Sequence, residues 1–551
     1  MDYPLETFTE EERARLAPHV TNLDRPVFAL VNLPETVKGA LFARYSRYPG
    51  TLRRLFLDEF AGDLPQGVSE WEGAEGERAA KLYERVFLGY GDDSVAQLGG
   101  MHVACEWVSN VLTKILQRPR LGAYLEQSTR YIAYDAPMPD GRAPRLLGGG
   151  AAPSGGSGAS GGRFRYYRDA QLDPAYEAAM DGLFTTYGRA LPQVTAWASE
   201  RFPRAEGEAP AAHERAVRAK ALDLIRGLLP AASLSHMGIF ATGQTYEQLV
   251  LHLLAHPLPE AQSYGRMILG EVQAVMPSFV ARVQRPDRGG RWVEFLRHRE
   301  ETGARWSRRL GLGAGGGGVD AGPSVRLLEV GGDEDRLLAA LLFEVSGAPE
   351  EESLAAVRSL AGEDRAALLE DLLGGRENRR HRPGRGLEAL RYRFEIVSDY
   401  GAFRDLQRHR MLTCQWQALT PHLGAGVPAE VDDAGCGDDY RRALDASRAE
   451  YERLVGAGLP RAAPYALCLG YRIRYVLDLN AREAMQLIEL RSGREGHPSY
   501  RAVAREMHAQ IAEVHPAVGA AMVHVDQATE PRLERMLAEM RTPAPVRSFG
   551  A

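Results

Sequence analysis

The chain of 551 residues lacks any apolar run that approaches the roughly 20 residues needed to span a bilayer. Its N-terminus is acidic, and Thr9 and Glu12 have the spacing of a helix-capping box rather than the pattern of a signal peptide. Cysteine is scarce, with no CxxC and no His/Cys group at zinc-like spacing; the four residues are Cys105, Cys414, Cys436 and Cys468. We therefore expect a cytoplasmic protein with no membrane contact and no metal site.

Familiar nucleotide-binding and nucleophile motifs are also missing. No Walker A, GxGxxG or GxSxG element occurs in a convincing context. His252 and His256 are four apart and His236 lies upstream, but no HExxH and no carboxylate ligand pattern accompanies them. The net charge of −6 argues against binding nucleic acid over the whole surface. Any basic site must therefore be local.

The length suits two domains of about 200–250 residues each. Glycine-rich stretches lie at 148–162, inside the first half, and at 311–322, near the midpoint. Such segments are typical of flexible loops and linkers. We expect a first domain at 1–310 that carries the insert 148–162, a linker at 311–323 and a second domain at 324–551.

What the chain does contain is an arginine-rich segment that occurs twice. The first copy reads Arg118-Pro119-Arg120 and continues into the polar stretch Glu126-Gln127-Ser128-Thr129-Arg130-Tyr131. The second copy begins 290 residues later as Arg408-His409-Arg410, but its polar stretch is lost. Arginine offers planar, bidentate donors that stay charged, which suit a phosphate or a flat, electron-rich ring. Each copy has what the other lacks, so we expect one site to be rebuilt where the halves meet.

The residues before the arginines repeat as well. In each half, three apolar residues alternate as in a strand: Val103, Cys105 and Trp107, then Tyr392, Phe394 and Ile396. Ser109 and Ser398 follow them and are placed to cap a short helix that runs into the basic cluster. The same order of strand, cap, helix and arginines predicts two copies of one α+β unit.

Plainer explanations account for the single pieces. Cations at a helix end complement the negative end of the helix dipole, by about 0.3–1 kcal/mol each, which explains Arg118 and Arg408 without any ligand. The segment 126–131 also fits a polar turn that enters a strand at 131–134. Arg482 and Arg491 are nine apart on one helical stretch, about half a turn off a common face, and fit two solvated arginines.

Taken together, these segments resemble the flavin-dependent thymidylate synthases. That family has an Arg-His-Arg cluster followed by Ser, Asn-Glu, Ser and Arg-Tyr, with an earlier Gly-His-x-Ser element and a later Asn-Ala-Arg…Leu-x-Leu-Arg helix. The matching pieces are Gly91-Asp92-Asp93-Ser94, Arg118-x-Arg120, Glu126-Gln127-Ser128-x-Arg130-Tyr131, Arg226 ahead of Leu229-Pro230, Arg408-His409-Arg410, Asn480-Ala481-Arg482 and Leu490-Arg491. The separation of eleven positions from Asn480 to Arg491 is the one that the family uses. The resemblance implies two tandem thymidylate-synthase-complementing-type domains, each an antiparallel sheet with long helices.

Each half departs from the family's pattern in a different place. In the first half, Pro119 stands for the histidine, Ala123 for the serine and Leu125 for the asparagine. In the second half, Trp416 stands for the glutamate and Thr420-Pro421 for the Arg-Tyr pair. The two kinds of damage are complementary. The resemblance therefore implies one composite site shared by the two halves and a second, pseudo-equivalent site that is dead.

The resemblance also implies an activity: methylation of dUMP to dTMP with methylenetetrahydrofolate, FAD and NADPH. Arg491 is the implied catalytic residue, because it would stabilise negative charge that develops on the pyrimidine. The implied nucleotide-binding residues are Glu126, Gln127, Ser128, Arg130, Arg226 and Arg408. The implied FAD-binding residues are Ser94, Arg408, His409, Arg410, Asn480 and Arg482. Members of the family build their sites at the interfaces of a homotetramer, so a homodimer of this chain would mimic the tetramer.

Two functions of other classes stay open. The histidine, serine and asparagine lost from the first copy favour a catalytically silent flavin- or nucleotide-binding paralogue. A nucleic-acid-binding protein would place the arginines on a phosphate backbone, but the acidic net charge and the absence of aromatic–basic interleaving disfavour it. The colour of the purified protein discriminates, since a nucleotide binder without flavin is colourless and the enzyme is yellow with FAD.

Overall fold

The computed structural model describes residues 6–33, 35–45, 48–61, 97, 99–137, 163–312 and 322–536. Ser94, the insert 148–162 and most of the expected linker 311–323 lie outside these residues. The chain forms two compact units. Unit 1 comprises Met1–Ala190, Leu228–Gly316 and Asp439–Cys468, and unit 2 comprises Leu191–Gly227, Gly317–Asp438 and Leu469–Ala551. Each unit takes one segment from the other half of the sequence, and domain boundaries at 310 and 324 stay a prediction.

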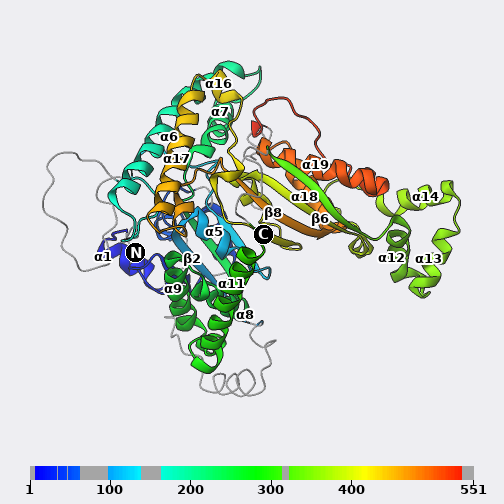
Figure 1. The fold of residues 1–551 in the computed structure, drawn as a ribbon, viewed down its shortest axis with the longest axis horizontal. Coiled ribbons are helices and arrows are strands. Elements are labelled where there is room, and N and C mark those ends of the chain that lie inside the picture. The colour runs from blue at the N-terminus through cyan, green and yellow to red at the C-terminus, as the bar shows by residue number, and fades with distance from the viewer. Residues whose placement is uncertain are drawn as a thin grey trace, which may run out of the picture. The chain divides into compact units, whose positions relative to one another are not determined.

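Each unit is built on a four-stranded antiparallel sheet (Figure 1). In unit 1 the order is β1 (Val27–Leu30), β2 (Gly100–Ser109), β4 (Leu234–Thr242) and β3 (Gly122–Glu126). In unit 2 it is β5 (Ser324–Gly331), β6 (Arg391–Asp399), β8 (Arg472–Asn480) and β7 (Thr413–Trp416). The two sheets share one strand order, first, second, fourth and third. This confirms the predicted fold class, α+β with two tandem copies of an antiparallel sheet and long helices.

The helices of unit 1 cover its sheet and extend from it. They are α1 (Glu10–Leu16), α2 (Glu35–Tyr45), α3 (Leu52–Leu55), α5 (Asn110–Leu116), α8 (Gly243–Ala255), α9 (Pro259–Val275), α10 (Pro277–Val280), α11 (Arg291–Arg309), the first part of α6 (Pro174–Arg201) and nearly all of α17 (Gly437–Gly456). Helix α9 has a proline in its first turn, and its fully buried Tyr264, Ile268 and Val272 recur every four residues. Through this apolar face α9 packs on β1 and β2.

Helices α6 and α17 of unit 1 run antiparallel, and ion pairs tie them at both ends. Near the start of α6, Asp173 accepts two hydrogen bonds from Arg453, at 2.7 and 2.8 Å. Further along, Arg189 lies 2.9 Å from Asp439 at the start of α17. The four residues belong to unit 1, so the segment 439–468 is fixed within that unit although it comes from the second half of the sequence.

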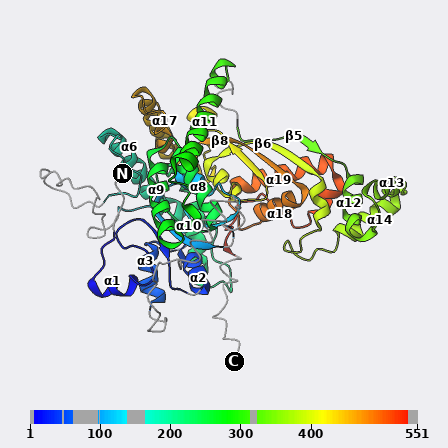
Figure 2. The same cartoon turned by 90° about the horizontal axis from the view of Figure 1, so that it is seen from below.

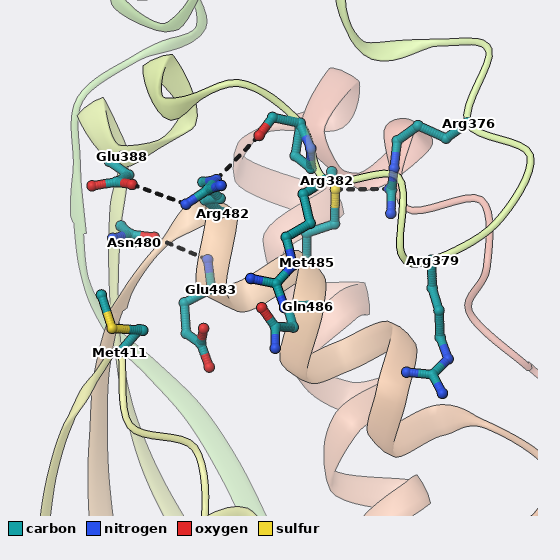
Figure 3. A pocket seen from close by; sticks show the side chains of 11 residues that line it. Arg376, Arg379, Arg382, Glu388, Met411, Asn480, Arg482, Glu483, Met485 and Gln486 are labelled. Carbon is teal, nitrogen blue, oxygen red and sulfur yellow. Dashed lines mark hydrogen bonds and ion pairs between the residues drawn. The ribbon is translucent and has the colours of Figure 1, made fainter. Parts of the chain in front are cut away.

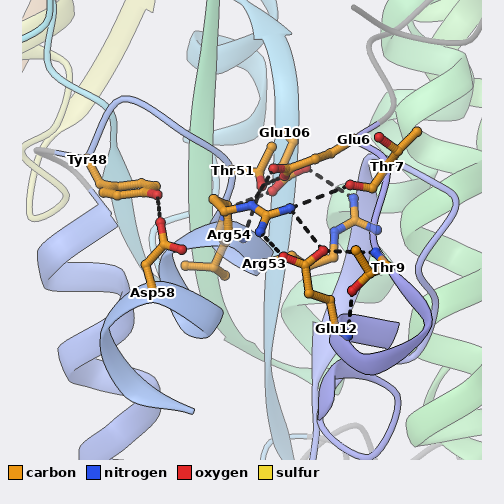
Figure 4. A network of polar contacts seen from close by, with 11 residues as sticks. Glu6, Thr7, Thr9, Glu12, Tyr48, Thr51, Arg53, Arg54, Asp58 and Glu106 are labelled. Atoms are coloured by element: carbon orange, nitrogen blue, oxygen red, sulfur yellow. Dashed lines mark hydrogen bonds and ion pairs between the residues drawn. The ribbon is translucent and has the colours of Figure 1, made fainter. Parts of the chain in front are cut away.

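The N-terminal arm of unit 1 is held by carboxylates around α3 (Figure 4). Arg54 donates to Glu6 at 2.7 Å and also bonds Glu12, which completes the predicted capping box with Thr9. Beside it, the buried Arg53 and Glu106 form an ion pair at 3.1 Å. Burial raises the pKa of Glu106, and the charge of Arg53 opposes that rise. Glu106 lies where the register of β2 against β4 shifts, between Cys105 and Val108.

In unit 2, α18 (Ala481–Ser492) and α19 (Pro498–Val514) lie side by side, and α19 packs on β5 and β6 (Figures 1 and 2). Helices α12 (Glu334–Ser346), α13 (Glu350–Arg358) and α14 (Gly362–Leu373) gather at one end of this sheet. The other described α-helices of the unit are the last part of α6, α7 (Pro210–Ile225), α15 (Tyr400–Leu406), α16 (Glu430–Asp433) and α20 (Pro516–Ala521). Among the described helices of the chain, none is long and apolar enough to cross a membrane.

The helix caps confirm one prediction and correct another. Ser109 caps α5, since its hydroxyl accepts a hydrogen bond from the Leu112 amide at 3.0 Å. In the second half the cap of α15 is Asp399, which accepts from the Ala402 amide at 2.8 Å. The prediction of Ser398 was wrong, because this buried hydroxyl pairs with Tyr475 across the sheet. Asp399 also lies as far before its arginine cluster as Ser109 does, so the repeat itself points to the aspartate.

The polar stretch of the first copy follows a strand rather than leading into one. Strand β3 ends at Glu126, and residues 131–134 form a turn and irregular backbone. The amides of Tyr131 and Ile132 both donate to the Ser128 carbonyl, at 3.2 Å. The alternative of a turn entering a strand at 131–134 is therefore wrong. The polar residues lie where β3 leaves the sheet.

Glu260 of α9 joins three segments in the core of unit 1. One carboxylate oxygen accepts from the Ser109 amide at 2.9 Å, and the other accepts from the Ser109 hydroxyl at 2.7 Å and the Tyr465 hydroxyl at 2.6 Å. Burial raises the pKa of Glu260 to about 7, although these hydrogen bonds oppose the rise. The folded protein therefore holds a proton here that the unfolded chain releases at much lower pH.

We expect the free energy of unfolding to fall as pH rises from about 4.5 towards 7, because folded Glu260 binds a proton more tightly than unfolded Glu260 does. The group accounts for at most about 3 kcal/mol over that window. Glu260→Gln should flatten the slope, whereas Tyr465→Phe, which keeps the carboxyl group, should retain it. Urea unfolding at stepped pH measures both. A slope unchanged in Glu260→Gln would contradict the assignment.

Candidate functional site

Arginines from three separate segments of unit 2 converge on Asp405 in α15. Arg226 begins the 3-10 turn after α7, Arg408 follows α15, and Arg491 lies in the last turn of α18. Nη1 of Arg226 is 3.5 Å from one carboxylate oxygen of Asp405, and those of Arg408 and Arg491 are 3.6 and 3.9 Å from the other. Asp399 adds a second carboxylate, 3.9 Å from Arg226. Among these described contacts, three cations meet two anions, which favours an anionic ligand. We call Arg226, Arg408 and Arg491 the arginine cluster.

Arg226 is the most enclosed member of the arginine cluster. The residue is only 4% exposed, and its Nη2 is buried without a hydrogen-bond partner among the described residues. Gly401 makes room for it: a Cβ atom there would lie 3.0 Å from Nη2 and 3.1 Å from Nε. An unsatisfied buried donor costs about 1–3 kcal/mol, so a ligand oxygen at this point would be stabilising.

His409 links Arg491 to Glu483. Nε of Arg491 donates to Nε2 of His409 at 3.0 Å, and Nδ1 of His409 lies 2.9 Å from a Glu483 carboxylate oxygen. Because arginine Nε is always a donor, Nε2 must accept, so Nδ1 carries the proton and donates to Glu483. Burial lowers the pKa of His409, and the charges of Arg491 and Arg410 lower it further, against the effect of Glu483. His409 is therefore a neutral link that holds Arg491.

Arg491 itself is held from three sides. Besides His409 and Asp405, the ring of Tyr500 lies 5.6 Å from its guanidinium carbon. Burial lowers the pKa of Arg491, and Asp405 opposes this, but a guanidinium stays charged at any physiological pH. A fixed cation in poorly solvated surroundings exerts a strong field on a neighbouring ligand.

A cavity of about 50 Å³ opens at the start of α18 in the same unit (Figure 3). Asn480 caps the helix by accepting from the Glu483 amide at 2.9 Å. Arg482 donates to the Pro383 carbonyl at 3.1 Å and to Glu388 at 3.3 Å. Glu483 lines the cavity and bonds His409, so a chain of contacts connects the cavity with the arginine cluster.

The structure thus brings together six of the predicted residues in unit 2. They are Arg226, Arg408, His409, Asn480, Arg482 and Arg491. Arg410 is exposed directly after His409, and Ser94 lies outside the described residues. Both ring nitrogens of His409 are used within the unit, and a direct role of this residue in binding FAD stays a prediction.

The other predicted residues lie in unit 1, at the last residue of β3 and directly after it. Glu126 is buried and accepts from Lys114 and from Gln117, both at 2.9 Å. The amide group of Gln127 donates to the Tyr48 carbonyl at 2.7 Å. These contacts give Glu126 and Gln127 a stabilising role in unit 1, and a role in nucleotide binding stays a prediction for both.

The remaining two residues of that stretch shape a turn. The Ser128 hydroxyl accepts from the Arg130 amide at 3.3 Å, and Arg130 is 8% exposed. Gln127 meanwhile accepts from Arg165 at 2.8 Å, and the Arg165 guanidinium lies over Trp107 and Tyr134. That Ser128 and Arg130 share a site with residues of unit 2 stays a prediction.

Two residues of the site were not found from the sequence, Asp405 and Glu483. Asp405 lies three residues before Arg408 and forms an i,i+3 ion pair with it. Glu483 is the third residue of a helix capped by Asn480, which is the usual place for an acidic side chain. Both signals are local, and neither indicates that the same side chain reaches a second partner far away in sequence.

The first copy carries different residues at the equivalent positions. Thr242 caps α8 at the end of β4 as Asn480 caps α18 at the end of β8, which sets the register of the two helices. With that register and the shared arginines, the equivalents are Ile115 for Asp405, Pro119 for His409, Thr245 for Glu483 and Leu253 for Arg491. None of these four side chains carries a charge, so the first copy cannot build the same cluster from these positions.

We expect His409 to stay neutral around pH 6.5, the usual pKa of histidine, with its proton on Nδ1. Arg491→Ala should raise the pKa of His409, because it removes a cation and frees Nε2 to take a proton while Glu483 remains. Arg410→Ala is the matched control, since it removes a more weakly acting arginine and leaves Nε2 engaged. Nitrogen-15 NMR of the imidazole measures tautomer and pKa. A proton on Nε2 in the unsubstituted protein would contradict the proposed link.

Comparisons with known proteins identify relatives along the whole chain. Residues 55–278 and 330–517 match the family model described as thymidylate synthase complementing protein. A UPF0159 protein of Chlamydia muridarum is 36% identical, over 98% of this chain and 99% of that protein. A UPF0159 protein of Thermoplasma acidophilum is 29% identical, over 92% and 98%. Among solved structures, the UMP/dUMP methylase PolB of Streptomyces cacaoi with 5-Br dUMP covers 39% of this chain and 100% of its own, with 19% identity and a TM-score of 0.31.

The family model matches well over half of the chain, with one matched segment in each half. Arg408, Arg491 and the helix that begins after Asn480 fall within the second matched segment. Arg226, the third member of the arginine cluster, falls within the first. The chain therefore belongs to the thymidylate synthase complementing protein family, the flavin-dependent thymidylate synthases, as two tandem copies.

Proposed function

We propose that this chain methylates dUMP to dTMP, with methylenetetrahydrofolate as the carbon donor, FAD as the redox cofactor and NADPH as the reductant. Family membership supports the class of reaction. The observation that carries the proposal is the arginine cluster around Asp405, with a buried Arg226 donor that has no hydrogen-bond partner among the described residues. Such a site suits an anionic nucleotide better than a neutral substrate.

In this proposal the arginines divide the nucleotide between them. Arg226 takes a phosphate oxygen with its unsatisfied Nη2, and Arg408 and Arg491 face the pyrimidine. Arg491 then stabilises the negative charge that develops on the ring as its C5 reacts, and no nucleophilic side chain is needed. His409 keeps this guanidinium in place and, being neutral, adds no competing charge.

The residues at the start of α18 fit a phosphorylated cofactor. The cavity there is lined by Arg482 and Asn480, and the ion pair of Arg482 with Glu388 is about one-third exposed, so a ligand can replace it at low cost. FAD bound beside the nucleotide would supply the hydride that completes the methyl group. The protein's own part is to bind and orient both ligands and to hold Arg491 charged. A cytoplasmic location and a homodimer stay predictions.

The decisive experiment is dUMP-dependent release of the C5 proton by the purified, FAD-loaded chain. Arg226→Ala and Arg491→Ala should each weaken dUMP binding by about 10- to 100-fold, because each removes charge-assisted hydrogen bonds to the ligand. Arg326→Ala is the control, since this exposed arginine of β5 pairs only with Glu395 among the described residues and should bind dUMP normally. Calorimetric titration with dUMP measures all three.

The outcomes separate the alternatives. Bound FAD and dUMP without proton release would establish the catalytically silent paralogue instead of the enzyme. Normal dUMP binding in Arg491→Ala would show that the arginine cluster is not the nucleotide site. Arg130→Ala tests the composite site on its own. If this variant binds dUMP normally, the prediction that the stretch after β3 binds the nucleotide is wrong, while the proposal for the arginine cluster is unaffected.

A further inference from the structure

We propose that the loop after α14 supplies two arginines, Arg379 and Arg382, that bind the diphosphate of the FAD cofactor. This inference rests on the proposed function and adds two arginines that the Arg-His-Arg and Asn-Ala-Arg motifs do not include. The loop runs from 374 to 384 and carries the sequence Arg376-Glu377-Asn378-Arg379-Arg380-His381-Arg382. Its arginines come from a different part of unit 2 than the residues at the start of α18 (Figure 3).

The base of the loop is anchored on α18. Arg376 binds both carboxylate oxygens of Glu489, at 2.9 and 2.6 Å, and the two side chains are 7% and 0% exposed. Nε of Arg376 donates to the His381 carbonyl at 2.7 Å, which closes the loop on itself. The His381 ring in turn lies 2.8 Å from the Asn378 amide group. This anchoring fixes the part of the loop that carries Arg379 and Arg382.

Arg379 and Arg382 line the cavity at the start of α18 together with Arg482. Neither of the two loop arginines forms a hydrogen bond or an ion pair with any described residue. The other charges in this place are matched: Arg376 pairs with Glu489, Arg482 with Glu388, and Glu483 bonds the neutral His409. The charges that remain are the two cations Arg379 and Arg382 and the single anion Glu483. The cavity therefore has an excess of positive charge, to which the amino end of α18 adds.

The size of the cavity restricts what it accepts. Its volume is about 50 Å³. A buried water needs about 10–15 Å³ of such space, so the cavity accommodates a group of a few heavy atoms rather than a ring system. Guanidinium groups match the oxygens of phosphate in planar, bidentate geometry. A phosphate group is thus the chemistry that satisfies both the charge and the volume.

The cavity is connected with the arginine cluster, which is why we take the phosphate to be part of the dinucleotide cofactor FAD. Glu483 lines the cavity and bonds His409, which bonds Arg491, so the cavity and the proposed pyrimidine end of the site are joined through one histidine. A cofactor with its flavin beside Arg491 and its diphosphate under the loop uses both places. FAD has such a diphosphate between its two halves.

The test is FAD binding by the full-length, flavin-stripped chain, followed by flavin fluorescence. Arg379→Ala/Arg382→Ala should weaken FAD binding about tenfold, and calorimetry should show the same loss for ADP, which carries the diphosphate without the flavin. Arg379→Lys/Arg382→Lys keeps both charges and should retain most of the affinity. Arg380→Ala is the matched control, because it removes the same charge from the same loop but does not line the cavity. All three residues are exposed, so thermal unfolding should not change.

The outcomes of this test distinguish a failure of this inference from a failure of the proposed function. If FAD binds the double alanine variant as tightly as the unsubstituted chain, the inference is overturned and the proposed function stands. If the unsubstituted chain binds no FAD, both are overturned. If ADP nevertheless binds and depends on the two arginines, the ligand is a nucleoside diphosphate of another kind. An equal loss of FAD affinity in Arg380→Ala would show that the effect comes from the overall positive charge of the loop, and would also overturn the inference.

Discussion

The hydrogen-bonded link from Glu483 through His409 to Arg491 is the contact on which the site in unit 2 depends. Glu483 and Arg491 lie near opposite ends of α18, and His409 bonds both of them from the loop after α15. One neutral imidazole therefore holds the loop after α15 against α18. It positions Arg491 by a hydrogen bond and Arg408 because that residue is next to it in sequence. Arg491 also lies near Asp405, and Asp405 lies near Arg226. A substitution of His409 that moves Arg491 would therefore alter the contacts of the whole arginine cluster.

Much of this arrangement follows from the sequence, because its signals are local. The alternating Tyr392, Phe394 and Ile396 are fully buried in β6, and the helix that carries Arg482 and Arg491 lies where its pattern predicts. Ser398 was misjudged because a serine at the end of a strand fits a cap as well as a cross-strand hydroxyl pair does. The repeat would have resolved this, since Asp399 is the equivalent of Ser109. The repeat predicts two copies of one unit, but the strand order that both sheets share comes from the structure.

What the sequence could not supply are contacts between distant segments. Asp405 is unremarkable in a helix, and its meaning comes from Arg226, which reaches it from a segment that precedes it by more than 170 residues. Glu126 was expected to bind a nucleotide, yet its carboxylate accepts from Lys114 and Gln117 in a buried pair. The family motif carries the residue type but not its partner. A glutamate that binds a ligand and one that binds a lysine look alike until the lysine is placed.

The buried charges show why the two copies have different uses. Three buried carboxylates of unit 1 have partners: Glu106 has Arg53, Glu126 has Lys114, and Glu260, whose pKa is raised to about 7, accepts three hydrogen bonds. A buried charge without a partner is costly, so matched charges stabilise a fold and leave nothing for a ligand. In unit 2 the described cations outnumber the carboxylates near them, and Arg226 keeps a buried donor without a hydrogen-bond partner among those residues. Buried guanidinium nitrogens without a hydrogen-bond partner also occur in unit 1, at Arg53 and Arg165. The convergence of three arginines on Asp405 is therefore the reason to propose the nucleotide site in unit 2 rather than at the first copy's arginines.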